Sequence, residues 1–90
     1  MDAIGMVETN SYVAAVQAAE AMVRAANVEI VGVERSGAHV TVIARGNPAA
    51  ARSAVSAGGR AAERLGGLVA SEVICAPAAS TEKLLPTGGA

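Results

Sequence analysis

Few side chains of this 90-residue sequence have types and spacings that support catalysis or metal binding. The chain has one histidine, His39, and one cysteine, Cys75; a catalytic dyad of the two is conceivable but disfavoured. Zinc sites use three or four Cys, His or carboxylate ligands, whereas His39 with Glu34 across a hairpin would supply two at most. The glycine motifs of nucleotide-binding sites, GxGxxG and GxxxxGK[ST], are absent. We therefore predict that the chain is not an enzyme and holds neither a metal ion nor a cofactor.

The histidine lies in a short polar segment, Arg35-Ser36-Gly37-Ala38-His39, between two runs of β-branched residues. Serine and glycine favour a tight turn, so residues 28–45 are predicted to form a β-hairpin. A two-residue loop at Ser36-Gly37 would place Glu34 opposite His39, whereas a three-residue loop would shift this register. In a single chain, His39 and Arg35 would be ordinary half-exposed residues. Repeated around an oligomer axis, they would form a ring of charged groups.

The composition points to a small domain that gains stability from neighbouring copies. Hydrophobic residues make up 52% of the chain, but Tyr12 is the one aromatic residue, so alanine, valine and glycine must form a thin core. The formal net charge of −1 argues against nucleic-acid and anionic-membrane partners. No leader peptide or 18-residue apolar run is present, and one cysteine cannot form an intrachain disulfide. We expect a cytoplasmic protein.

The first half of the chain predicts a strand ending near Glu8, a helix over residues 12–26, and strands at 28–35 and 39–45. Thr9, Asn10 and Ser11 are candidates for the helix N-cap. The helical spacing aligns one apolar stripe, which we expect to face the core: Tyr12, Val16, Ala19, Val23 and Ala26. Glu20 and Arg24 are four residues apart, in the order that favours an ion pair on the helix surface.

The second half predicts a helix from Pro48 to Leu65, capped by Asn47, and a strand over residues 68–75. Its apolar stripe comprises Ala51, Val55, Gly58, Ala62 and Leu65. Each glycine of the Gly58-Gly59 pair costs the helix about 1 kcal/mol, which indicates close packing against a sheet or another chain. Residues 80–84 form a short helical candidate in the tail. The order β-α-β-β-α-β predicts a ferredoxin-like α+β fold: a four-stranded antiparallel sheet with two helices on one face and a short C-terminal helix or tail.

Three stretches resemble one known family: AIGMVET at residues 3–9, AAEAMVRAANVEIVGVE at 18–34 and VTVIARG at 40–46. They are similar to the blocks of bacterial microcompartment shell proteins, in particular the single-domain, hexamer-forming class. The resemblance implies a shell domain over residues 1–78, followed by a tail at 79–90. It also implies a cyclic homohexamer that tiles into the facets of a shell around enzymes. The loop after the second strand, here Arg35, Ser36, Gly37, Ala38 and His39, would line a central pore for small polar metabolites.

The same resemblance assigns the edge at which hexamers meet. The lysine that family members carry there corresponds to Arg24, with Asn27 nearby. Ala76 stands where relatives have an arginine after the last strand. The expected partners are further copies of the chain, other shell proteins and the encapsulated enzymes. A ferredoxin-like regulatory module that binds a small molecule between subunits is the alternative.

Overall fold

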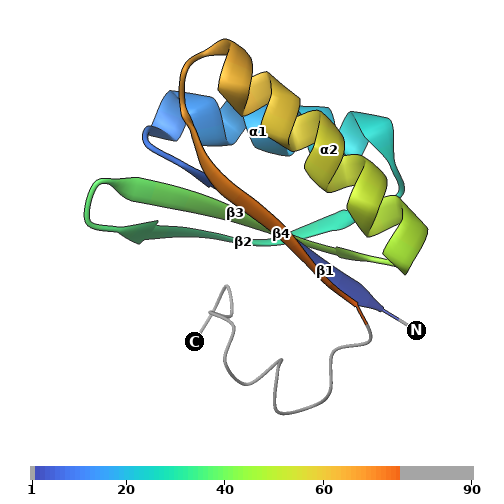
Figure 1. Ribbon diagram of the computed structural model, residues 1–90. Helices are drawn as coiled ribbons and strands as arrows, with labels where there is room; N and C mark the ends of the chain where they lie inside the picture. Colours follow the sequence, from blue (N-terminus) through green and yellow to red (C-terminus); the bar gives the residue numbers. More distant parts are fainter. Residues whose placement is uncertain (1, 76–90) are drawn as a thin grey trace.

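The computed structural model describes residues 2–75, which form one layer of helices on one layer of sheet (Figure 1). The elements follow the predicted β-α-β-β-α-β order, and each strand and helix lies within two residues of the predicted position. Their bounds are β1 Ala3–Thr9, α1 Tyr12–Ala25, β2 Glu29–Ser36, β3 His39–Gly46, α2 Pro48–Arg64 and β4 Leu68–Cys75. The predicted tail helix at residues 80–84, Ala76 and the proposed boundary at residue 78 lie outside the described residues.

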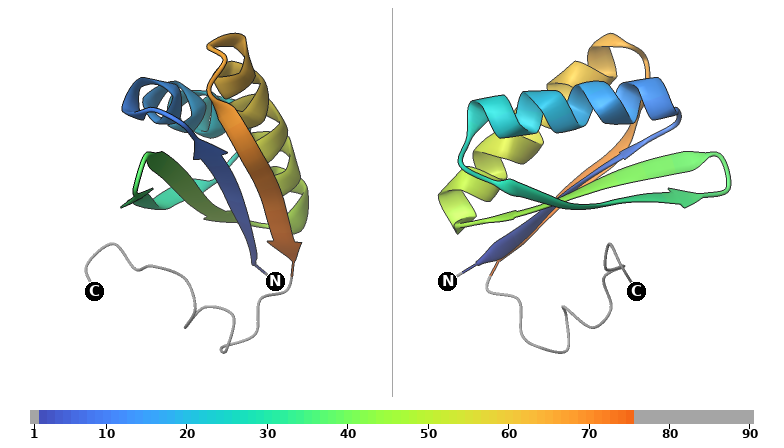
Figure 2. Two further views of the ribbon diagram at one scale, coloured as in Figure 1. Left: turned by 60° about the vertical axis from the view of Figure 1, so that its left-hand side comes forward. Right: turned by 180° about the vertical axis from the view of Figure 1, so that it is seen from behind.

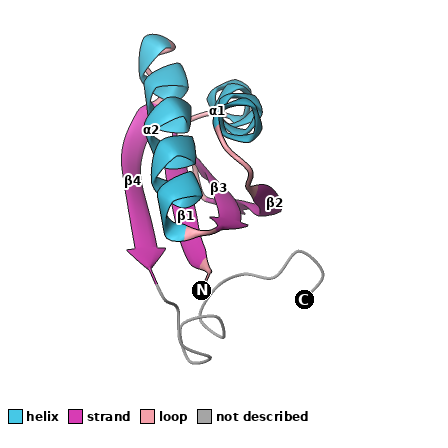
Figure 3. Ribbon diagram, turned by 90° about the vertical axis from the view of Figure 1, so that its right-hand side faces the viewer, coloured by secondary structure: helices cyan, strands magenta, loops and turns pink. Residues whose placement is uncertain are grey.

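The four strands form one antiparallel sheet in the order β2-β3-β1-β4, with both helices on the same face (Figures 2 and 3). The other face of the sheet is not covered by either helix, and we call it the open face. Side chains alternate between the two faces along each strand. Gly5 lies against Val55 of α2 and so marks the helix side of β1. Met6 and Glu8, one and three residues further along the strand, therefore lie on the open face.

Both helices begin at the residues that the sequence nominates. The Ser11 hydroxyl accepts a hydrogen bond from the Ala14 amide at 3.1 Å, and the Asn47 side chain accepts one from the Ala50 amide at 2.8 Å. These caps satisfy amides that the first turn of a helix otherwise leaves without a partner. Pro48 occupies the first turn of α2, where the missing N–H has no cost. At the other end of α2, Gly66 adopts a positive φ of 67° and ends the helix.

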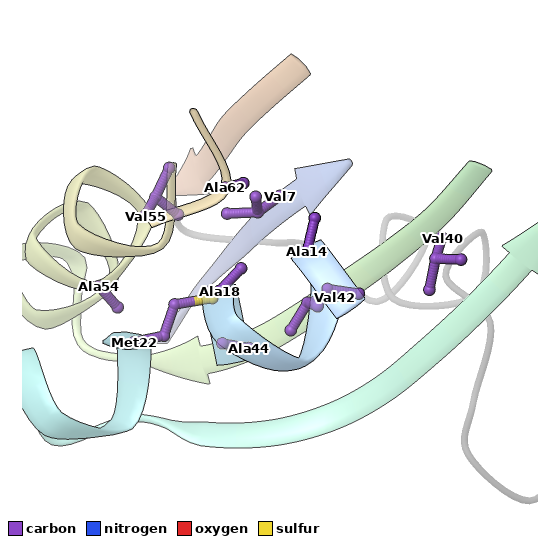
Figure 4. Packing of buried hydrophobic residues seen from close by; sticks show 11 residues of the cluster. Val7, Ala14, Ala18, Met22, Val40, Val42, Ala44, Ala54, Val55 and Ala62 are labelled. Atoms are coloured by element: carbon purple, nitrogen blue, oxygen red, sulfur yellow. The ribbon is translucent and has the colours of Figure 1, made fainter. Parts of the chain in front are cut away.

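The core is built from small side chains between the helices and the sheet (Figure 4). Alanines of α1 and α2 face valines of β1 and β3, and Met22 is the one long side chain at the centre of this cluster. Gly58 lies so close to α1 that an added Cβ would be 2.6 Å from Met22 Cγ and 3.2 Å from the Ala18 carbonyl oxygen. The predicted close approach at Gly58 is confirmed. Its partner is helix α1 of the same chain, not a sheet or another chain.

The apolar stripe predicted for α1 is divided: Ala19 and Ala26 are half-buried against the core, whereas its three large residues are exposed. Tyr12 is 61% exposed, Val16 46% and Val23 48%. The residues that α1 buries are Ala14, Ala15, Ala18 and Met22. The prediction was wrong for Tyr12, Val16 and Val23, because the helix meets α2 and the sheet mainly through alanines, which allow the backbones to approach closely. The α2 stripe is confirmed except for Leu65, which follows the helix and is 54% exposed.

Candidate pore hairpin and assembly surfaces

The hairpin of β2 and β3 turns at Gly37 and Ala38, and Ser36 pairs with His39. This register differs from both predicted loops: Arg35 lies opposite Val40, and Glu34 lies opposite Thr41. Gly37 has a φ of 59°. Positive φ at the first of two turn residues matches the right-handed twist of the strands, and glycine adopts it without strain. The turn therefore centres on Gly37, with Ser36 ending β2.

The five residues predicted to line a pore lie together at this hairpin end, which projects beyond both helices (Figure 1). Arg35, Ser36, Gly37 and Ala38 are exposed, and His39 is half-buried. The tip therefore presents a serine hydroxyl, turn backbone and a methyl group, with a guanidinium and an imidazole immediately behind it. Such a group of polar atoms can hydrogen-bond a small polar molecule, but the hairpin of a single chain does not surround an opening.

The partner of His39 is Glu8 of β1, whereas a two-residue loop at Ser36-Gly37 would have placed Glu34 opposite it. His39 Nδ1 and Glu8 Oε2 are 2.9 Å apart, and their side chains are 44% and 35% exposed. The two side chains meet because Glu8 pairs with Thr41, two residues from His39 on the same face of β3. Sequence reasoning missed Glu8 since its proximity depends on β1 lying beside β3. The period-two alternation of each strand was the available signal, but the strand order was needed to use it.

The open face has a depression of about 240 Å³ between β3, β1 and β4. Its lining combines two carboxylates with small polar and apolar groups: Met6, Glu8, Thr41, Ala70, Ser71 and Glu72. The Glu8 side chain thus borders this depression on one side and contacts His39 on the other.

The disfavoured dyad of Cys75 and His39 is separated by the length of the sheet. Cys75 pairs with Ala3, whereas His39 adjoins Val40, which pairs with Thr9. Ala3 and Thr9 are six residues apart along β1, about 20 Å at the rise of a strand. The Cys75 thiol contacts the Arg52 guanidinium instead, at 3.4 Å. Within residues 2–75, no three His, Cys, Asp or Glu side chains are grouped so as to hold a metal ion.

Two further surfaces of α1 are exposed in the single chain. Arg24 and Asn27 lie exposed at the C-terminal end of α1, and the predicted pair of Arg24 with Glu20 is confirmed at 3.2 Å. The second surface, which we call the outer apolar stripe, comprises the exposed residues Tyr12, Val13, Val16 and Val23 of α1. Neither helix in the described part of the chain has the length and apolar character needed to cross a bilayer.

This two-layer α+β domain, with its small-residue core and exposed hairpin, has the fold of one known protein family. The BMC domain matches residues 3–77, and the chain belongs to the BMC domain family. It is 48% identical over 88 residues to the bacterial microcompartment shell protein PduA of Citrobacter freundii, covering 97% of this chain and 95% of the relative. Identity to the Escherichia coli K12 shell protein EutM is 44% over 89 residues, covering 98% and 92%. The carboxysome shell protein CsoS1 of Prochlorococcus marinus is 46% identical over 88 residues, covering 96% and 85%.

A solved structure supports the same assignment. The crystal structure of a microcompartment protein from Desulfitobacterium hafniense superposes with a TM-score of 0.77 at 30% identity. The match covers 83% of this chain and 41% of that one, so this chain spans less than half of the longer protein. The ferredoxin-like fold is thereby confirmed. The chain is a structural shell protein of a bacterial microcompartment and not an enzyme; the regulatory-module alternative finds no support among these relatives.

Proposed function

We propose that six copies of the chain form a cyclic homohexamer, and that hexamers join edge to edge into the facets of a shell around enzymes. The observation that carries this proposal is the outer apolar stripe. Three of its valines are between 46% and 66% exposed, while the buried face of the same helix consists of three alanines and a methionine. A 90-residue domain with so thin a core stabilises itself further by burying such a stripe against another copy.

Replacing Val16 with glutamate tests the stripe as an interface between copies. A carboxylate buried in an apolar interface is strongly unfavourable, so Val16→Glu should shift the protein toward smaller species. Gln17→Glu is the matched control, because it adds the same charge at the neighbouring exposed position. Native mass spectrometry and electron microscopy report hexamers and sheets respectively. If Val16→Glu and Gln17→Glu both leave hexamers and sheets intact, the stripe is not an interface between copies.

The hairpin tip is proposed to line a pore on the six-fold axis. Ser36, Gly37 and Ala38 would form its rim, with Arg35 and His39 behind them. Six serine hydroxyls and the turn backbone would provide donors and acceptors around a narrow opening, a lining that favours small polar metabolites over bulky or apolar ones. Support comes from the exposure of the four residues from Arg35 to Ala38, which the single subunit leaves without a packing role.

The pore proposal is tested by placing a larger, apolar side chain at the rim. Ser36→Leu should leave hexamers intact and slow the rate at which an encapsulated enzyme consumes a small polar substrate supplied from outside. Ser53→Leu provides the control, since Ser53 is an exposed serine of α2 remote from the hairpin. Equal substrate consumption by both variants and the unmodified shell would show that Ser36 does not border the path.

The edge of the tile is proposed to include Arg24 and Asn27, which lie exposed at the end of α1. A guanidinium offers a planar set of donors that suits carboxylate or carbonyl acceptors on a facing hexamer. Because Ala76 stands where relatives have an arginine, the edge would lack that charged partner. Other shell proteins with the same edge geometry would be able to join the facet, and the enclosed enzymes would lie on one side of it.

A further inference from the structure

We propose that Glu8 and His39 set the charge selectivity of the pore, and that protonation of His39 shifts this selectivity toward anions. The inference rests on the proposed function, because it assumes that the hairpin borders the path of the metabolite. It adds a residue from β1, outside the hairpin, and a dependence on pH.

The contact between the two side chains determines which nitrogen of the neutral imidazole carries the proton. An ionised carboxylate only accepts hydrogen bonds, so His39 Nδ1 must donate to Glu8 Oε2 across the 2.9 Å separation. When His39 is neutral, its proton is therefore on Nδ1, and Nε2 carries a lone pair. Protonation adds a proton at Nε2 and keeps the bond to Glu8. The pair can therefore change charge while the hairpin base keeps its geometry. Histidine is the side chain that makes this change between about pH 5 and 8.

The charged groups around His39 come from the other three strands of the sheet. Glu8 of β1 contacts it, and Glu34 of β2 lies on the same face because it is opposite Thr41. Arg35 is opposite Val40 and therefore lies on the helix side of the same hairpin. Glu72 of β4 is opposite Met6 on the open face, one row further from the tip than Glu8. The two helices are on the other side of the sheet (Figure 3).

These positions determine how the field near the tip changes with pH. With His39 neutral, Arg35 contributes one positive charge and Glu8 and Glu34 one negative charge each, so the hairpin base is net negative. Protonation of His39 adds one positive charge and brings the net charge of these four groups to zero. In a ring of six subunits, this change removes a net negative charge from every position around the opening at once. Charges within a Debye length, about 8 Å at physiological ionic strength, act on an ion in a narrow passage with little screening.

The expected consequence is a change in which ions pass. With His39 neutral the ring disfavours anions, whereas with His39 protonated that barrier is removed. Shells of the full chain can be loaded with a fluorophore that iodide and caesium both quench, and the entry rate of each ion measured by stopped flow. We expect the ratio of iodide to caesium entry to rise about threefold or more from pH 8 to pH 5.5.

Two substitutions of His39 fix the charge in opposite states. His39→Gln is neutral throughout and should keep the low ratio of pH 8, whereas His39→Arg is charged throughout and should show the high ratio at both pH values. Glu8→Gln removes one negative charge and should raise the ratio at pH 8. A ratio that is independent of pH in the unmodified shell, or that changes equally in His39→Gln, would overturn the inference. If Ser36→Leu slows neither ion, the hairpin does not border the path and the proposed function itself fails.

An independent measurement addresses the contact in solution. The chain has one histidine, so nitrogen NMR of the imidazole gives one assignable pair of signals. At pH 8, we expect the Nδ1–H tautomer in the assembled protein and loss of that preference in Glu8→Ala. An Nε2–H tautomer in the unmodified protein would overturn the inference, even where the flux variants fail to assemble.

Discussion

The neighbouring glycines of α2 predict stability changes of opposite sign for the same substitution. At Gly58, a Cβ would lie 2.6 Å from Met22 Cγ, 3.0 Å from Met22 Sδ and 3.2 Å from the Ala18 carbonyl oxygen. Met22 is fully buried, and the carbonyl belongs to the backbone of α1, so the helices would have to move apart. Overpacking of this kind costs about 1–3 kcal/mol, against about 1 kcal/mol gained in helix propensity. The cost exceeds the gain, so Gly58→Ala should destabilise the protein.

Gly59→Ala is the matched control on the same helix. Its Cβ would meet only Leu68 Cδ2, at 3.9 Å, which is ordinary van der Waals contact. This variant therefore keeps the propensity gain and should be up to about 1 kcal/mol more stable than the parent protein. A difference of about 2 kcal/mol between the variants corresponds to roughly 8–16 °C in Tm for a domain of this size. Thermal unfolding should be followed at one fixed protein concentration, because assembly raises the apparent stability. A Gly58→Ala protein that melts at or above Gly59→Ala would refute the packing argument.

Two further substitutions test the edge and the base of the hairpin. Arg24→Asp places a like charge beside Glu20, the present partner of Arg24 at 3.2 Å, and should abolish sheets while leaving hexamers intact by native mass spectrometry; sheets that persist would place the edge contact elsewhere. The fully buried Thr9 hydroxyl is 2.8 Å from the Val40 carbonyl oxygen and 2.9 Å from that of Ser11. Thr9→Val should therefore lower the free energy of unfolding by about 1–3 kcal/mol in urea titrations, while Thr9→Ser, which keeps the hydroxyl, should lose less; a loss in Thr9→Ser as large as that in Thr9→Val would show that the hydroxyl contributes no more to stability than the methyl group.

The elements of the fold are local in origin and could be predicted from the sequence. Ser11 and Asn47 are capping residues directly before helical spacing, and Gly66 follows the last turn of α2. These signals operate over three or four residues, so they need no knowledge of the tertiary structure. A close contact at Gly58 could also be predicted from the sequence. Glycine lowers helix stability, so its presence in the middle of a helix indicates that there is no room for a side chain.

Features that depend on strand order or on other chains could not be predicted in the same way. The contact of Glu8 with His39 joins residues 31 positions apart and exists only because β1 lies beside β3. The hairpin register differs from the predicted one because the turn is formed by Gly37 and Ala38, with positive φ at Gly37. The position of this one residue determines which residues of β2 and β3 pair. The outer apolar stripe of α1 has the periodicity of a buried face. Periodicity identifies an apolar face but does not say whether the same chain or another copy covers it.

The most direct test of the account is a cryo-electron microscopy structure of the assembled full-length protein. We predict rings of six subunits, with residues 35–39 of every subunit around the six-fold axis and the outer apolar stripe buried between copies. A ring with the β2–β3 hairpin at its perimeter, or a closed dimer or trimer with the stripe exposed to solvent, would contradict the proposed pore and the proposed assembly.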